Sequence, residues 1–326
     1  MDTDGHLPNE MNKNRHLISL SETFKKTIIN VHKNKGKLWL EQFEELLRYI
    51  EEKWKLAIQP PFELSYNFVA PAQTDSGREV VVKLAVVHDE FYSEVEALQY
   101  FAGRSMVRVV DMEPERGILI LERLTPGYTL AELEDGNVAM EIAADIMQSL
   151  WVKDTKTSTL PQIEERQQSL QRFLNRHPKG KGPISAATLQ KALQVFKSLL
   201  SDNKQRYILH GDLHHYNILK GDNWTAIDPK GLVGEREYDT IQLLLNKLPQ
   251  EAELQPILEN RIQLLVKRLN LDVKRLLAYG FAHSTLSICW SLEEGEDYCI
   301  LFYKSIEIFE KMYENSCPRA KNDVMY

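Results

Sequence analysis

A short polar motif in the second half of the chain constrains the fold more than any other feature. It reads His-Gly-Asp-Leu-His-His-Tyr-Asn-Ile-Leu over residues 210–219, and an Ala-Ile-Asp sequence follows at 226–228. Apolar residues on both sides of a polar turn predict two short strands joined as a hairpin. Such a hairpin would gather two carboxylates and one amide, those of Asp212, Asn217 and Asp228.

The spacing of these groups predicts phosphoryl transfer. Four residues separate Asp212 from Asn217, as in the kinase catalytic loop H-R-D-x-x-x-x-N. One carboxylate must accept a hydrogen bond from the attacking hydroxyl, while an amide oxygen and a second carboxylate hold Mg²⁺ against nucleotide phosphates. Asp212 is therefore expected to be the catalytic base, and Asn217 and Asp228 the metal ligands.

The histidines of the motif raise an alternative, a zinc site. His214 and His215 are adjacent and cannot easily face one ion, and no Cys or Glu completes a tetrahedral set. We therefore expect no zinc site, and we expect His210 to orient the loop by hydrogen bonds.

Lys83 is the candidate for holding nucleotide phosphates. It lies in the apolar run 80–87, so its side chain must either reach solvent or point at an anion. Glu94 follows on a predicted helix, in the order of the kinase strand-lysine and helix-glutamate pair. Glu96 is an alternative partner, but the two glutamates face different directions and only one can serve. Glu94 is preferred because a packed apolar face would then lie beside it.

The distribution of periodic segments predicts an α+β, two-lobed, protein-kinase-like fold. Residues 1–59 are expected to form an arm, to about residue 30, and an amphipathic helix that ends at Pro60-Pro61. Residues 60–122 are expected to form a small antiparallel nucleotide-binding sheet with one helix, and 123–326 a larger, mostly helical catalytic lobe. A ligand cleft is expected between the lobes.

The individual elements follow from apolar periodicity and turn signals. Strands are predicted at 64–73, 78–87, 107–113 and 117–122. Helices are predicted at 90–101, 138–152, 160–175, 186–201, 238–247, 253–269, 272–292 and 297–315. The glycine-rich stretch 179–183 is predicted to be a flexible loop.

Composition excludes several classes. The 326 residues are 43% hydrophobic and 27% charged, typical of soluble globular proteins. No apolar run approaches the roughly 20 residues of a membrane span, and the N-terminus lacks the features of a secretory signal. The net charge of −7 argues against nucleic-acid binding. The three cysteines are expected to be reduced, partly buried thiols of a cytoplasmic protein. The partner expected is a small hydroxylated molecule; oligomeric state is left open.

Together, these motifs resemble the aminoglycoside phosphotransferase and choline kinase superfamily. The segments 64–71, 121–124 and 226–235 are similar to the streptomycin 6-kinase group, which is classed with hydroxyurea-resistance kinases as antibiotic-resistance kinases. The resemblance covers about residues 30–300. It implies ATP and Mg²⁺ as cofactors, with Lys83 and Glu94 at the phosphates. It also implies a hinge whose backbone groups bind adenine, formed by Glu122, Arg123 and Leu124.

The chain departs from the kinase pattern at two places. No G-x-G-x-x-G loop is present, and Ser65-Tyr66-Asn67 takes its place, so Ser65 is the candidate phosphate contact there. Asp228 is followed by Pro229-Lys230 rather than Phe-Gly. Lys230 is expected either to add positive charge near the phosphates or to pair with Glu235 or Asp239.

The resemblance implies an ATP-dependent kinase of a small-molecule hydroxyl, with an aminoglycoside such as streptomycin as the first candidate acceptor. A metabolic kinase of a small alcohol fits the same catalytic residues. A pseudokinase is disfavoured because the expected lysine, base and metal ligands are all present. Acidic and aromatic side chains suit a polycationic sugar. The acceptor pocket is accordingly expected near Glu235, Trp290, Glu293, Glu294 and Asp297.

Overall fold

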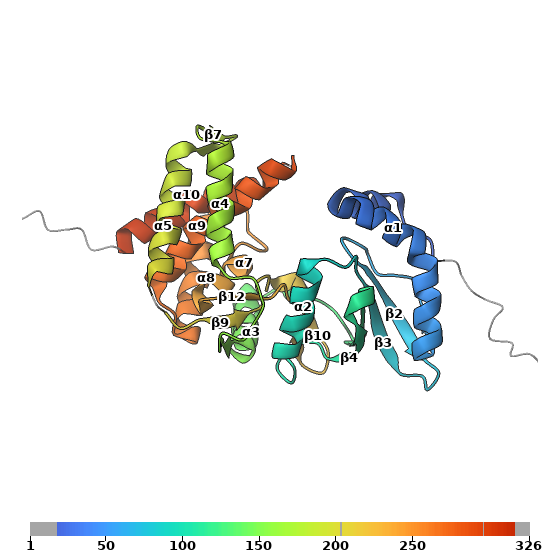
Figure 1. Ribbon diagram of the computed structural model, residues 1–326. Coiled ribbons are helices and arrows are strands. Elements are labelled where there is room, and N and C mark those ends of the chain that lie inside the picture. The colour runs from blue at the N-terminus through green and yellow to red at the C-terminus, as the bar shows by residue number, and fades with distance from the viewer. Residues whose placement is uncertain (1–17, 203, 296, 317–326) are drawn as a thin grey trace, which may run out of the picture. The chain divides into compact units, whose positions relative to one another are not determined.

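The structure is a computed structural model that describes residues 18–202, 204–295 and 297–316 (Figure 1). The chain forms two compact units. The smaller contains the residues up to Val87 together with Val110–Arg123. The larger contains His88–Val109 and the chain from Leu124 onward.

A five-stranded antiparallel sheet forms the centre of the smaller unit. Its strands, in spatial order, are β1 (Leu56–Ile58), β2 (Phe68–Thr74), β3 (Glu79–Leu84), β5 (Ile118–Glu122) and β4 (Val109–Glu113). The four predicted strands are confirmed, with shorter bounds. The three-residue β1 was not predicted, because it pairs with β2 across the sheet and has no periodicity of its own.

Helix α1 (Glu22–Trp54) packs against one face of this sheet. The core between them contains Phe24, Ile28, Trp39 and Phe43 of the helix and alternate residues of the strands. Val82 and Leu84 belong to this core. Side chains alternate across a strand, so Lys83 projects from the opposite face.

The expectation of an arm to residue 30 was wrong for its described part. The hydroxyl of Ser21 accepts a hydrogen bond from the N–H of Phe24 at 3.2 Å, an N-cap that starts the helix. Lys33 has non-helical angles (φ 53°, ψ −122°) and divides α1 into two segments. The helix ends at Trp54, where Lys55 takes a left-handed conformation, and not at Pro60-Pro61. Residues 1–17 lie outside the described chain.

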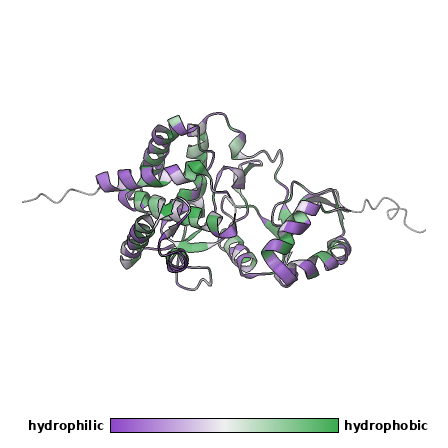
Figure 2. Cartoon of the chain, turned by 90° about the horizontal axis from the view of Figure 1, so that it is seen from above, coloured by the Kyte–Doolittle hydropathy of each residue, from purple (hydrophilic) through white to green (hydrophobic). Residues whose placement is uncertain are grey.

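The larger unit is built mainly from helices, and seven of the eight predicted helices are confirmed within a few residues at each end. The long ones are α2 (Asp89–Tyr100), α3 (Gly136–Leu150), α4 (Glu164–Arg176), α5 (Ala186–Ser201), α8 (Leu254–Leu269), α9 (Val273–Glu294) and α10 (Ile300–Ser316). The stretch 238–247 forms parts of two short helices, α6 (Arg236–Asp239) and α7 (Ile241–Leu244). The helices in Figure 2 carry both hydrophilic and hydrophobic residues, as amphipathic helices should.

Short strands complete the larger unit. They are β6 (Val152–Lys153), β7 (Gly180–Lys181), β8 (Ile184–Ser185), β9 (Tyr207–Leu209), β10 (Ile218–Lys220), β11 (Trp224–Ala226) and β12 (Leu232–Gly234). The stretch 179–183, predicted to be a flexible loop, instead forms most of the β7–β8 hairpin. The antiparallel order β12-β9-β6 places the chain before and after the polar motif side by side.

Within the described residues, no helix has the length and apolar character that a bilayer crossing requires.

Candidate active site

The predicted catalytic motif lies entirely in the larger unit. Gly211 follows β9 with φ +80°, a conformation that favours glycine, and the chain turns there before Asp212. A 3₁₀ turn over His215–Asn217 leads into the β10–β11 hairpin, which returns the chain to Asp228. The predicted hairpin is confirmed. Asp228 has φ +55°, a strained conformation of the kind that gathers at functional sites.

His210 is fully buried and joins the two halves of the motif. Its Nε2 lies 3.0 Å from the carbonyl oxygen of Ile227, and its Nδ1 accepts the backbone N–H of Asp212 at 3.2 Å. Because Nδ1 accepts, Nε2 carries the ring proton and donates to Ile227. Burial lowers the pKa of His210 and favours this neutral ring. The predicted role in orienting the loop is confirmed.

Asp239 supports the same loop from α6. Its carboxylate accepts the N–H of Gly211 at 2.9 Å, the N–H of His210 at 3.4 Å and the indole N–H of Trp151 at 2.9 Å. Burial raises the pKa of Asp239, and these donors oppose the shift. The sequence suggested Asp239 only as a partner of Lys230. Its true partners lie 28 to 88 residues away in the chain, so no local pattern indicates them.

Asp212, the predicted base, keeps a partly exposed carboxylate. Gln242 Nε2 donates to its Oδ1 at 3.2 Å, and Lys230 Nζ lies 3.7 Å from its Oδ2. Lys230 thus pairs with Asp212 and not with Glu235 or Asp239, and the expectation of such a pairing was wrong. Gln242 was not identified from the sequence.

Asn217 and Asp228 are suited to hold Mg²⁺. The amide nitrogen of Asn217 donates to the carbonyl oxygen of Asp212 at 3.0 Å, which turns its amide oxygen, the ligand atom, away from that carbonyl. Asp228 is exposed. One carboxylate and one amide oxygen are a small set of ligands, but Mg²⁺ commonly takes few protein ligands and keeps waters and nucleotide phosphates for the rest. The donor set therefore fits the ion.

The other two histidines of the motif have structural contacts. His215 Nδ1 lies 2.9 Å from Asn246 Oδ1, and His214 Nδ1 accepts the N–H of Tyr216 at 3.3 Å. No group of three His, Cys, Asp or Glu side chains gathers at a metal-binding distance in the described part of the chain.

Several of the predicted nucleotide-binding residues belong to the smaller unit. Lys83 is buried in β3, opposite Val69 of β2 and Leu119 of β5. Glu122 ends β5, and the guanidinium of Arg123 stacks on Phe62 at 4.8 Å. The smaller unit ends at Arg123, and Leu124 begins the second segment of the larger unit.

Ser65 lies in an exposed loop of the smaller unit. It lines a cavity of about 560 Å³ beside the start of α1, together with hydroxyl groups from the helix and the segment before it. These are the hydroxyls of Ser19, Ser21, Thr23 and Thr27.

The two glutamates of α2 have different surroundings. Glu96 accepts a hydrogen bond from the N–H of Thr159 at 2.9 Å and another from its hydroxyl. Glu94 is buried, with 8% of its surface exposed. Glu96 is therefore engaged within its own unit.

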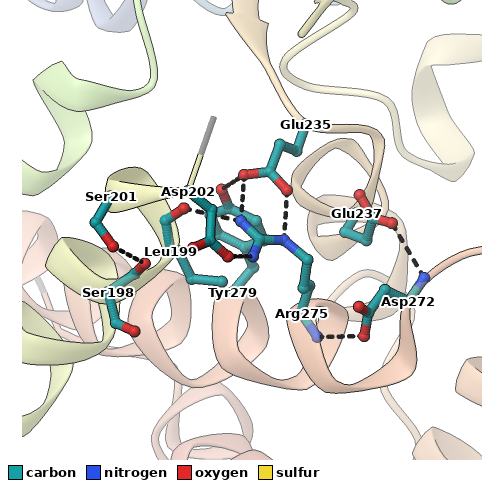
Figure 3. A network of polar contacts seen from close by, with 9 residues as sticks. All are labelled: Ser198, Leu199, Ser201, Asp202, Glu235, Glu237, Asp272, Arg275 and Tyr279. Carbon is teal, nitrogen blue, oxygen red and sulfur yellow. Dashed lines mark hydrogen bonds and ion pairs between the residues drawn. The ribbon is translucent and has the colours of Figure 1, made fainter. Parts of the chain in front are cut away.

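Glu235, expected beside the acceptor, instead lies inside a buried network (Figure 3). Its oxygens accept hydrogen bonds from Arg275 Nε at 2.5 Å, from Arg275 Nη2 at 2.6 Å and from the Tyr279 hydroxyl at 2.8 Å. Arg275 also donates to Asp202 at 2.7 Å and to the Leu199 carbonyl at 2.8 Å. With its carboxylate surrounded by protein donors, Glu235 has a structural role, and its assignment to the acceptor pocket was wrong.

The other residues proposed for the acceptor lie near the end of α9. Glu293 forms an ion pair with Arg176 at 2.6 Å. Trp290 donates to the Ser169 hydroxyl at 3.1 Å and carries the guanidinium of Arg166 on its ring at 5.4 Å. Glu294 and Asp297 are exposed.

Solved structures of several kinases share the fold of this chain. A choline kinase, LicA from Streptococcus pneumoniae, matches 84% of this chain and 99% of its own with a TM-score of 0.59 and 14% identity. A thermostable mutant of the aminoglycoside phosphotransferase APH(4)-Ia, solved with ADP and hygromycin B, matches 83% of this chain and 98% of its own, with a TM-score of 0.56 and 15% identity. The predicted two-lobed, kinase-like fold is confirmed.

The sequence assigns the chain to a family. Residues 58–295 match the family described as aminoglycoside/hydroxyurea antibiotic resistance kinase, and the chain belongs to this family. The streptomycin 6-kinase of Streptomyces glaucescens is 22% identical over 303 residues, which is 86% of this chain and 92% of that protein. The predicted phosphotransferase class and the resemblance are both confirmed.

Proposed function

We propose that this protein transfers the γ-phosphate of ATP to a hydroxyl group of a small molecule, with an aminoglycoside such as streptomycin as the first candidate. The observation that carries the proposal is the arrangement of Asp212, Asn217 and Asp228 on one loop and hairpin. Buried hydrogen bonds of His210 and Asp239 fix the position of this loop. Family membership and the similarity to a streptomycin 6-kinase support the same reaction.

Each residue of the site has a defined task in this proposal. Asp212 Oδ2 accepts the hydrogen bond of the acceptor hydroxyl and aligns it for in-line attack. Gln242 holds the other oxygen of that carboxylate. Asn217 and Asp228 would hold Mg²⁺, which when bound neutralises charge on the nucleotide phosphates. Lys83, with Glu94 as its partner, binds the phosphates, and the backbone at Glu122, Arg123 and Leu124 binds adenine.

One observation favours a second candidate acceptor. Glu235 and Glu293, two of the acids expected to bind a polycation, are already paired with Arg275 and Arg176. That pairing leaves fewer carboxylates for the guanidinium groups of streptomycin, and it favours a small metabolic alcohol as the alternative acceptor.

An ADP-release assay distinguishes these acceptors. The purified protein would be given ATP and Mg²⁺ with streptomycin, with deoxystreptamine aminoglycosides, and with small alcohols such as choline and homoserine. Turnover with streptomycin alone supports the first candidate. Turnover only with a small alcohol replaces the aminoglycoside, and no ADP release with any acceptor contradicts the proposed activity.

A further inference from the structure

We propose that Lys230 is a further catalytic residue, whose ammonium group contacts the phosphoryl group as it passes to the acceptor beside Asp212. The inference rests on the phosphotransferase function proposed above. It concerns the residue two positions after the candidate metal ligand Asp228, where protein kinases have the glycine of Asp-Phe-Gly.

The backbone of Lys230 is fixed against the catalytic loop. The N–H groups of Lys230 and Gly231 both donate to the carbonyl oxygen of His210, at 2.9 and 3.1 Å. Gly231 has φ +70°, and a Cβ there would come within 2.7 Å of Leu160 Cδ2 and 2.9 Å of the Ser93 carbonyl oxygen. Only glycine fits this turn, so the root of the Lys230 side chain has one well-defined position.

The tip of the side chain remains available to a second anion. Its Nζ lies 3.7 Å from Asp212 Oδ2, longer than the roughly 2.7–2.9 Å of a charge-assisted hydrogen bond. The side chain is 52% exposed, whereas the buried Arg275 bonds Glu235 at 2.5 Å and is 10% exposed. A lysine ammonium has three donors, so Lys230 can face Asp212 and still donate to a phosphoryl oxygen.

A cation at this point would favour the transfer. The acceptor oxygen forms a bond to the γ-phosphorus, and its proton passes to the Asp212 carboxylate. The bond from that phosphorus to the bridging oxygen breaks, and its electron pair stays on the departing ADP. An anionic phosphoryl group thus approaches a carboxylate of like charge. Lys230 reduces this repulsion, as a fixed positive charge does wherever negative charge gathers in a transition state.

The alternative role for Lys230 is only to orient Asp212, which Gln242 already holds from its other oxygen. The two roles differ in what they predict for ATP hydrolysis, where water replaces the acceptor. A phosphoryl contact acts on both reactions equally. A residue that only orients Asp212 acts through that carboxylate, so Lys230→Met should not lower further the residual ATP hydrolysis of Asp212→Ala, whereas loss of a phosphoryl contact lowers it in that background too.

The test compares Lys230→Met and Lys230→Arg with wild type. Lys304→Met serves as the matched control, because Lys304 is also an exposed lysine paired with a carboxylate, that of Glu251. With Mg²⁺ and ATP, and with water or streptomycin as acceptor, we expect Lys230→Met to lower kcat about 100-fold in both reactions. The KM for ATP should stay within about threefold. Lys230→Arg should recover part of the rate, and the control should match wild type.

Other outcomes separate this inference from the proposed function. If Lys230→Met hydrolyses ATP within about threefold of the wild-type rate, or if only the acceptor KM rises, the phosphoryl contact is refuted. If wild type hydrolyses ATP but leaves streptomycin unmodified, the proposed acceptor fails and hydrolysis alone decides the role of Lys230. If wild type consumes no ATP, both the function and the inference are overturned.

Discussion

Removing the carboxylate of Glu235 should damage stability and leave acceptor recognition untouched. In Glu235→Ala, the guanidinium of Arg275 loses two short hydrogen bonds and the Tyr279 hydroxyl loses one. The two charged side chains are only 8% and 10% exposed, so water cannot replace the lost partner. A buried cation without its counter-charge is among the costliest defects in a protein.

The structure allows the size of this effect to be estimated. Breaking a buried ion pair by removing one partner costs about 3–5 kcal/mol. Arg275 keeps its bonds to Asp202 and the Leu199 carbonyl, so we expect a value of about 3 kcal/mol, near the low end of that range. For a unit of this size, the change corresponds to a fall in Tm of about 6–12 °C.

A surface pair provides the control. Arg268 forms a two-point contact with Asp145, with nitrogen-to-oxygen distances of 2.8 Å, but these side chains are 41% and 58% exposed. Asp145→Ala should therefore change the free energy of unfolding far less than Glu235→Ala does. Urea unfolding and calorimetry of both variants measure the difference. A normally stable Glu235→Ala protein with a raised acceptor KM would refute this reasoning and restore Glu235 to the acceptor pocket.

Three further predictions concern other parts of the larger unit. Asp239→Asn should lower kcat at least about tenfold and the free energy of unfolding by about 2 kcal/mol, because an amide nitrogen would face the N–H donors of the loop and of Trp151. Steady-state kinetics and urea unfolding measure these two effects. Burial lowers the pKa of His283 to about 3 and that of His215 to about 4, below the value of about 6.5 in an unfolded chain. The unfolded chain therefore takes up protons first as the pH falls. The free energy of unfolding should therefore be independent of these two histidines above about pH 6.5. Below that pH it should fall by about 1.4 kcal/mol per pH unit for each histidine. Urea unfolding at pH 7, 6 and 5 measures this slope, which should be shallower for His283→Gln. Glu94→Gln should raise the KM for ATP about tenfold, whereas Glu96→Gln, which loses only its contacts with Thr159, should leave it unchanged.

The long helices of the larger unit could be predicted because apolar periodicity over many residues is visible in the sequence. The short strands β6 and β12 have two or three residues and exist only because β9 pairs with both. Nothing local predicts them. The start of α1 was missed for another reason: Ser21 caps a helix whose first turns are largely polar.

The residues of the candidate site also differ in whether local sequence could reveal them. Asp212, Asn217 and Asp228 were recognised because their spacing lies within one hairpin. Asp239 and Gln242 were not, because they meet the loop only in the folded chain. Glu235 shows the opposite error. Its neighbours Arg236 and Glu237 suggest an exposed polar turn, but its partner Arg275 lies 40 residues further on. The function of a single charged residue depends on partners that sequence spacing does not reveal.

The most direct test of the proposed function is mass spectrometry of streptomycin after incubation with ATP, Mg²⁺ and either wild type or Asp212→Ala. We expect wild type to add one phosphate to the drug. Asp212→Ala should add no phosphate, because the base is absent. It should still bind ATP in a calorimetric titration, because the nucleotide contacts remain. Phosphorylated streptomycin from Asp212→Ala would contradict the role of Asp212. Unmodified streptomycin from wild type would contradict the proposed acceptor.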